Sequence, residues 1–254
     1  MAAKAESIRA EIYRSLEESI AKNGGRLEEE KIRVAVEQFD FGTKMPIAYP
    51  MIPGADVRLV ACPITPVRQP SIPPLMQEIA AAVADSSIVH VNTEDSMHVT
   101  MFHASHPDDR RPYSSEIRAK EIAILRDIVA DVAPFSLPLH SITAASSGSI
   151  IMLMDDPHDI TGTLRRRART AFPDLPSKVP QIVHSTLVRV LSPSISSTAL
   201  DALQSKCREL TKQLRDADFR ISLESVWYVE ETHYSTAKSG PCTTIPFPAS
   251  STEA

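Results

Sequence analysis

Two short segments of the chain place a histidine two residues before a threonine inside an apolar run. They are Met97-His-Val-Thr-Met-Phe102 and Val183-His-Ser-Thr-Leu-Val188. In a β-strand, residues i and i+2 point to the same face, so His98 is expected beside Thr100, and His184 beside Thr186. Two imidazoles can exchange protons with a reacting group, and two hydroxyls can donate to phosphoryl oxygens. Together, the four side chains are able to form a metal-free acid–base site.

The bare pattern is weak, but its apolar setting makes it more specific. Four of the eight histidines precede a serine or threonine by two positions, where the composition gives about one or two by chance. His103 runs into Ala-Ser-His-Pro, and His233 lies in a polar stretch, so only His98 and His184 keep apolar residues on both sides. A lone histidine in a half-buried strand is more often a scaffold residue. Two matching pairs in similar strands favour catalysis instead. Imidazole, with a pKa near 6.5, can act as acid or base around neutral pH.

The elements around the two segments predict a two-lobed α+β fold. Strand 97–102 leads to a helix beginning near 115, and strand 181–191 leads to a helix beginning near 196, as if one unit occurred twice. A hairpin is expected from 135–143 and 149–154, a helix near 160–171, and a final strand at 219–229. We therefore expect two antiparallel or mixed sheets that face a central cleft, with helices outside.

The flanking regions differ in composition from this central part. Ile8, Ile12, Leu16 and Ile20 form an apolar helix stripe that we expect to dock on the domain. Residues 27–39 fit helix or strand equally well, and eight prolines between 46 and 74 indicate an extended connector. We divide the chain into an N-terminal helical extension and connector (1–55), the two-lobed domain (56–236), and a flexible tail (237–254).

The paired apolar-His-x-Thr-apolar strands, 86 residues apart, resemble those of the two-histidine (2H) phosphoesterase superfamily, which includes LigT-like RNA ligases and 2′,3′-cyclic nucleotide phosphodiesterases. The resemblance covers roughly residues 56–236. It implies a metal-independent phosphoric diester hydrolase in which His98 and His184 are the acid–base pair and Thr100 and Thr186 hold the phosphate. It also implies a small cyclic nucleotide, or an RNA end with a 2′,3′-cyclic phosphate, as substrate. The extension before residue 56 is not part of the family pattern.

Other side chains are candidates for substrate contact. Arg110, Arg111 and Tyr113 follow the first motif and are expected at the rim of the cleft, while Tyr228 in the last strand is able to face it. The arginine run at 165–169 is expected on a solvated helix face, with a phosphate-backbone contact as the alternative.

Two clusters of histidine and aspartate suggest a different chemistry. They comprise His98, His103, His106, Asp108 and Asp109 in one segment, and Asp155, Asp156, His158 and Asp159 in another. A metal phosphodiesterase built on them is the less favoured hypothesis, because it leaves Thr100 and Thr186 without a role. We expect no metal and no cofactor. The three cysteines are far apart, and no glycine-rich phosphate loop occurs.

The net charge of −5 excludes nucleic-acid binding by bulk charge alone. No apolar run is long enough for a membrane span, and the acidic N-terminus does not resemble a signal or transit peptide. We expect a cytoplasmic protein, monomeric by default, that hydrolyses a cyclic phosphate or phosphodiester. The alternative of a different class is a non-catalytic RNA-binding or scaffolding protein that retains the fold.

Overall fold

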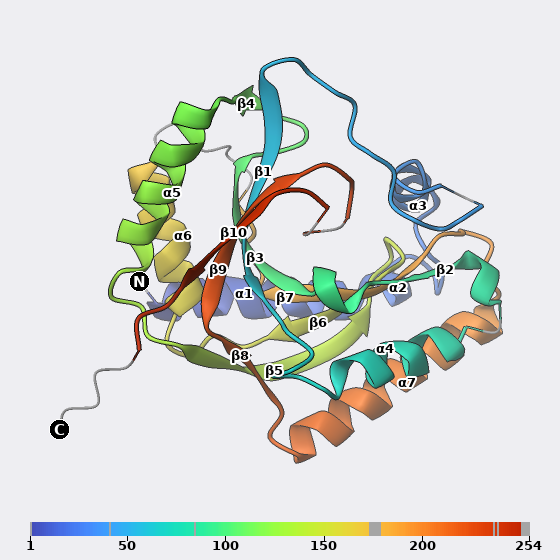
Figure 1. The fold of residues 1–254 in the computed structure, drawn as a ribbon. Coiled ribbons are helices and arrows are strands. Elements are labelled where there is room, and N and C mark those ends of the chain that lie inside the picture. The colour runs from blue at the N-terminus through green and yellow to red at the C-terminus, as the bar shows by residue number, and fades with distance from the viewer. Residues whose placement is uncertain are drawn as a thin grey trace.

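The protein consists of ten strands and seven α-helices within residues 2–40, 42–83, 85–172, 179–235, 237 and 239–249, which a computed structural model describes (Figure 1). The strands are β1 (Ala55–Pro63), β2 (Val89–Val91), β3 (His98–Ser105), β4 (Arg111–Pro112), β5 (Phe135–Ala144), β6 (Ser149–Met154), β7 (His184–Val190), β8 (Arg220–Leu223), β9 (Ser225–Glu231) and β10 (Cys242–Pro246). The helices are α1 (Ala2–Glu17), α2 (Ser19–Lys22), α3 (Glu29–Val36), α4 (Ile72–Ala81), α5 (Ser115–Val129), α6 (Ile160–Ala171) and α7 (Ser197–Asp216).

The strands form two five-stranded antiparallel sheets. The first sheet has the order β10-β9-β1-β3, with β4 beside the start of β1, and the second has the order β2-β7-β6-β5-β8. Each sheet contains one of the two motif strands, β3 in the first and β7 in the second. The predicted two-lobed α+β fold class is confirmed.

Three segments differ from the expected elements. The final strand expected at 219–229 is two strands in different sheets, because the chain leaves β8 at Glu224 and enters β9. Residues 242–246, which we expected in a flexible tail, pair with β9 as β10. The ambiguous stretch 27–39 contains helix α3, whose first turn holds Glu29 and Glu30, where carboxylates stabilise a helix N-terminus.

The two motif strands have the same burial pattern. In β3, the half-buried residues are His98, Thr100 and His103; in β7 they are His184, Thr186 and Arg189. The regular alternation breaks after the fourth residue of each strand, where the pairing with the neighbouring strand shifts register. Such a shift re-aims the side chains that follow it. A third residue of each strand therefore shares the face of its motif.

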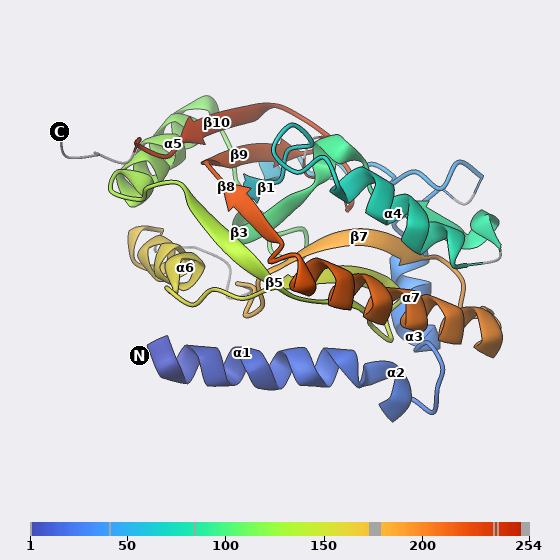
Figure 2. The ribbon, with the colours of Figure 1, turned by 90° about the horizontal axis from the view of Figure 1, so that it is seen from below.

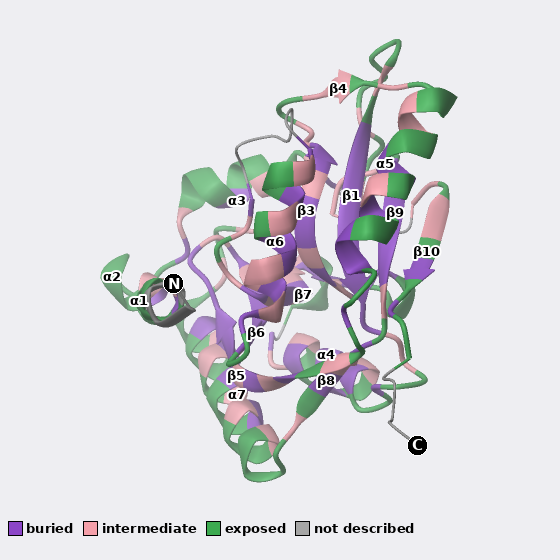
Figure 3. Ribbon diagram, turned by 90° about the vertical axis from the view of Figure 1, so that its left-hand side faces the viewer, coloured by how far each residue is buried: buried purple, intermediate pink, exposed green. Residues whose placement is uncertain are grey.

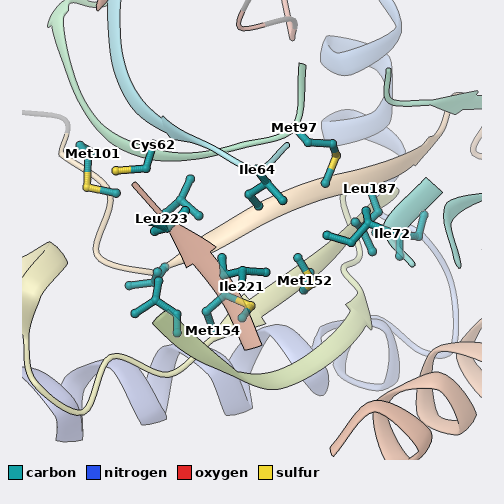
Figure 4. Packing of buried hydrophobic residues seen from close by; sticks show 14 of the residues in the cluster. Cys62, Ile64, Ile72, Met97, Met101, Met152, Met154, Leu187, Ile221 and Leu223 are labelled. Carbon is teal, nitrogen blue, oxygen red and sulfur yellow. The ribbon is translucent and has the colours of Figure 1, made fainter. Parts of the chain in front are cut away.

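One apolar core joins the two sheets. Cys62 and Met101 of the first sheet lie in the same buried cluster as Met152, Met154 and Leu187 of the second (Figure 4). The strands are largely buried, whereas the helices expose their outer faces (Figure 3). No helix within the described ranges has the length and apolar character needed to cross a bilayer.

The N-terminal extension packs against this domain. Helix α1 runs along the second sheet (Figure 2), and its Tyr13 and Leu16 contact Ile151 and Leu153 of β6. Further along the extension, Ile20, Leu27 and Ile32 are members of the main core cluster. The expected stripe docks only in part: Leu16 and Ile20 pack against the domain, whereas Ile8 is 44% exposed and the buried face of α1 is formed by Arg9 and Tyr13.

Helix α1 lies on the face of the second sheet that carries the second motif. In the antiparallel ladder, Leu153 is opposite His184 and Ile151 is opposite Thr186, and directly opposed residues point to the same face. The Tyr13 hydroxyl donates to the Met154 carbonyl (2.7 Å), lies 3.1 Å from the Val183 carbonyl and accepts from the Val183 amide (3.1 Å). Tyr13 thus holds the backbone of the residue immediately before His184.

Replacing Tyr13 by phenylalanine should therefore lower the free energy of unfolding by about 1–3 kcal/mol, because it leaves buried backbone groups without their partner. Urea unfolding followed by circular dichroism measures this change. Tyr234→Phe is the matched control, since its hydroxyl forms no hydrogen bond with the described part of the chain, and it should change stability by less than about 0.5 kcal/mol. Equal effects of the two variants would contradict the role of Tyr13.

Candidate active site

The two motifs come together because β3 and β7 lie next to each other. His98 and Thr100 share one face of β3, and His184 and Thr186 share one face of β7. Burial is the main reason why the pKa of His184 falls to about 3, and the positive charge of His98 is the next contribution. The two imidazoles are thus close enough for the charge of one to oppose the charge of the other.

The tautomer of His98 is fixed by the backbone. Its Nδ1 lies 2.6 Å from the Ser96 carbonyl oxygen, which can only accept, so Nδ1 carries the proton. In the neutral ring, Nε2 is then an unprotonated acceptor. Burial lowers the pKa of His98 below 6.5, while the carboxylate of Glu231 acts in the opposite direction. Both imidazoles are therefore uncharged at neutral pH.

The backbone of each motif threonine is held by a buried side chain. The Thr100 carbonyl accepts a hydrogen bond from Arg165 Nη2 (2.7 Å), and the Thr186 carbonyl accepts one from Asn92 Nδ2 (3.0 Å). Arg165 and Asn92 are 6% and 9% exposed. Buried hydrogen bonds of this kind fix the strand positions, and hence the directions of the two hydroxyls.

Arg165 links β3 to the segment that immediately precedes β7. From helix α6, its Nε donates to the Met101 carbonyl (3.1 Å), and its Nη2 donates to the carbonyls of Thr100 (2.7 Å) and Ile182 (3.0 Å). Strand β3 is the edge of its sheet, so its outward carbonyls need such partners.

Only Arg165 of the arginine run departs from the expected solvated face: Arg166 and Arg169 are exposed and Arg167 is half-buried. Arg167 pairs with Asp131 and donates to the Ile128 carbonyl, and exposed Arg166 pairs with Asp159. Helix periodicity turns only Arg165 inward, because consecutive residues point in different directions around the axis.

Arg189 belongs to the site, although the sequence analysis did not select it. It occupies the third half-buried position of β7, lies on the motif face, and donates from Nη1 to Ser149 Oγ (2.8 Å). Its charge contributes to the lowered pKa of both His98 and His184. The sequence contains one indication of this role. The residue five positions after the motif histidine is polar in both strands: Arg189 in β7 and His103 in β3.

Arg110, Arg111 and Tyr113 lie away from the motifs. In the strand ladders, Arg111 is opposite Asp56 near the start of β1, whereas His98 is opposite Pro63 at the end of β1. Seven residues of strand separate these two positions, which is roughly 23 Å.

The side chains of this group contact other parts of the protein. Arg110 donates to the Pro50 carbonyl (2.6 Å) and lies over the Tyr49 ring, and Tyr113 lies under the guanidinium of Arg58. Arg111 pairs with Asp109. The expected position of Arg110, Arg111 and Tyr113 at the rim of the site is wrong.

Tyr228 also points away from the motifs. It is opposite Val60 in the β1–β9 pair, whereas Leu59, the neighbour of Val60, is opposite His103 in the β1–β3 pair. Successive strand residues point to opposite faces, so Tyr228 is on the far side of the sheet. There it is fully buried, and its hydroxyl donates to Glu121 Oε2 (2.7 Å). The expectation that Tyr228 faces the site is therefore wrong.

The histidine and aspartate clusters do not assemble a ligand set. Among the described residues, no group of three or more His, Cys, Asp or Glu side chains has the arrangement to hold a metal ion. Asp156, for example, accepts from the backbone amides of Ile160 and Thr161 and caps helix α6.

The chain was compared with known proteins by sequence and by structure. No family model and no curated protein matches it. A conserved protein of unknown function from Agrobacterium tumefaciens, ATU0111, is similar in structure with a TM-score of 0.53 and 14% identity, over 83% of this chain and 90% of that chain. TT0787 of Thermus thermophilus is similar with a TM-score of 0.51 and 12% identity, over 76% and 99%.

A weaker likeness extends to a nucleotide complex. Escherichia coli LigT, solved with 3′-AMP, has a TM-score of 0.42 and 13% identity, over 76% of this chain and 96% of that chain. At this score the likeness carries no argument about function. The likenesses to ATU0111 and TT0787 concern the fold alone, because the identities are low.

Replacing Arg165 by methionine should lower the free energy of unfolding by about 3 kcal/mol or more, because a charged donor is lost and three buried carbonyls lose their partner. The matched control is Arg169→Met on the same helix, which changes an exposed side chain and should cost less than about 0.5 kcal/mol. Denaturant titration of both variants measures the difference. Similar losses in the two variants would show that Arg165 does not link the strands.

Proposed function

We propose that this chain, which has the fold of the 2H phosphoesterases, hydrolyses a cyclic phosphate or phosphodiester by acid–base catalysis without a metal. The single observation that supports the proposal is that β3 and β7, each with a histidine and a threonine on its half-buried face, are adjacent strands of two sheets. A 2′,3′-cyclic nucleotide, or an RNA end that carries such a phosphate, is the substrate class that we propose.

The two histidines would divide the proton transfers between them. Because Nδ1 of His98 is occupied by the Ser96 carbonyl, Nε2 is free to take a proton from the attacking water. The water oxygen bonds to phosphorus, the bond from phosphorus to one ribose oxygen breaks, and His184 gives its proton to that oxygen. The products are a phosphate monoester and a free hydroxyl, and the protons return through solvent. A bound phosphate anion favours the imidazolium form of His184 that this step needs.

Three further groups would hold the non-bridging oxygens. Thr100 and Thr186 offer one hydroxyl donor each, and Arg189 offers a guanidinium on the same face as His184. Donors that are already in place where negative charge develops lower the activation barrier without reorganisation. The backbone contacts of Arg165 and Asn92 support this arrangement, because they keep both threonines in position.

Alanine in place of His98 or His184 should lower kcat for nucleoside 2′,3′-cyclic monophosphates by about 10²–10⁴-fold, since each variant removes one proton carrier. His158→Ala is the matched control, because His158 is exposed after β6, and it should leave kcat unchanged. Product isomers and rates are measured by chromatography with and without EDTA. Activity that depends on added metal and survives both histidine variants would favour a metal phosphodiesterase, and absence of activity on every cyclic phosphate would favour a binding protein.

The pH dependence should differ between kcat/KM and kcat. In the free protein, the pKa of His98 lies below 6.5 and that of His184 is about 3, so the singly protonated pair is lost as pH rises through the pKa of His98. The alkaline limb of kcat/KM should therefore lie below pH 6.5. A bound phosphate anion raises both pKa values, which moves the alkaline limb of kcat to higher pH. Steady-state kinetics between pH 5 and 9 measure both profiles, and coincident limbs above pH 7 would contradict the assignment.

A further inference from the structure

A cavity of about 330 Å³ lies beside the first motif. Three separate parts of the chain form its wall: Met45 and Pro46 of the N-terminal extension, the segment from His90 to Ser96, and the link between β9 and β10 at His233. This volume lies at the lower end of the range, about 300–1,000 Å³, that is typical of small-molecule sites. It suits one nucleoside-sized group.

Two residues of the cavity wall form hydrogen bonds with motif residues. Ser96 lines the cavity, and its carbonyl oxygen holds Nδ1 of His98. Asn92 also lines it, and its side-chain amide donates to the Thr186 carbonyl. A third wall residue, His90, is opposite Arg189 in the β2–β7 pair and so lies on the motif face of the second sheet.

His90 presents a fixed, uncharged ring to the cavity. Its Nδ1 lies 2.8 Å from the Lys44 carbonyl, which leaves Nε2 as an acceptor, and its ring packs on Phe39 with centroids 4.8 Å apart. Burial lowers the pKa of His90, and the charge of Arg189 lowers it further, so the ring stays neutral at pH 7. A neutral flat ring with one acceptor can stack on, or accept a hydrogen bond from, a planar heterocycle.

The extension forms a built wall on the opposite side. Ile47 donates its amide to the Gln38 carbonyl (2.9 Å), and the Tyr234 amide donates to the Ile47 carbonyl (3.0 Å). Ala48 forms a β-bridge with His233. These backbone hydrogen bonds fix the segment that follows Pro46 and hold Met45 and Pro46 near His233. Their apolar surface complements the faces of a planar ring.

We propose that this cavity binds the base of the nucleotide whose phosphate lies between His98 and His184. The inference rests on the proposed function and adds to it a subsite that needs the N-terminal extension. It makes a nucleoside phosphate, rather than a small cyclic phosphate without a base, the preferred substrate.

The test compares ligands with and without a base. Isothermal titration calorimetry gives the Kd of adenosine 3′-monophosphate, cytidine 3′-monophosphate and inorganic phosphate for the full chain. We expect at least one nucleotide to bind more tightly than phosphate, and His90→Ala or His233→Ala to weaken nucleotide binding about fivefold or more, in line with the stacking of one base. Phosphate affinity should change less than twofold.

Met45→Ala keeps the test valid if the histidine variants fold poorly, because Met45 is 52% exposed. It should weaken nucleotide binding without affecting phosphate binding, and should raise KM for cyclic nucleotides without lowering kcat. Met51→Ala, 95% exposed in the same extension, is the control and should change nothing.

The outcomes separate the two proposals. Equal affinities for nucleotide and phosphate in the unmodified protein, or variants that change neither Kd nor KM, would overturn the base-binding inference while hydrolysis of cyclic phosphates could still be observed. Selective loss of nucleotide binding in a protein that hydrolyses no cyclic phosphate would support the cavity and overturn the catalytic proposal.

Discussion

The position of one motif relative to the other depends on side chains that bridge two separate sheets. Strands β3 and β7 belong to different sheets and share no backbone ladder. The Arg165 guanidinium joins the carbonyls of Thr100 and Ile182, and the Asn92 amide joins the Thr186 carbonyl to the region of Met97, whose sulfur lies 3.6 Å from Asn92 Nδ2. Burying a guanidinium is costly unless its donors are paired, so the three carbonyl contacts both stabilise Arg165 and align the strands. In the proposed mechanism, His98 and His184 depend on this link for their relative position.

The N-terminal extension has two places in this arrangement. Helix α1 covers the part of the second sheet next to His184 and holds Val183 through Tyr13, and the segment around Pro46 forms one side of the cavity beside His98. Two parts of the extension, helix α1 and the segment around Pro46, therefore lie near the motif residues.

The sequence predicted those features that depend on local periodicity. The alternation around His98 and His184 placed each histidine beside its threonine, and the hairpin expected from 135–143 and 149–154 is the β5–β6 pair. Features that depend on long-range pairing were not predictable. A shift of one residue in the pairing of β9 decides whether Tyr228 faces the site or Glu121, and nothing in the local sequence fixes that register. Arg165 reads as an exposed helix residue, because its acceptors are 64 and 65 residues away in the chain.

A crystal structure of the protein with a nucleoside vanadate tests the central claim most directly, because vanadate adopts the five-coordinate geometry of phosphorus in the transition state. The account predicts that the vanadate lies between the rings of His98 and His184, with Nε2 of His98 and a ring nitrogen of His184 on opposite sides and the hydroxyls of Thr100 and Thr186 on the equatorial oxygens. A vanadate that contacts only one of the two histidines, or binds elsewhere on the protein, would contradict it.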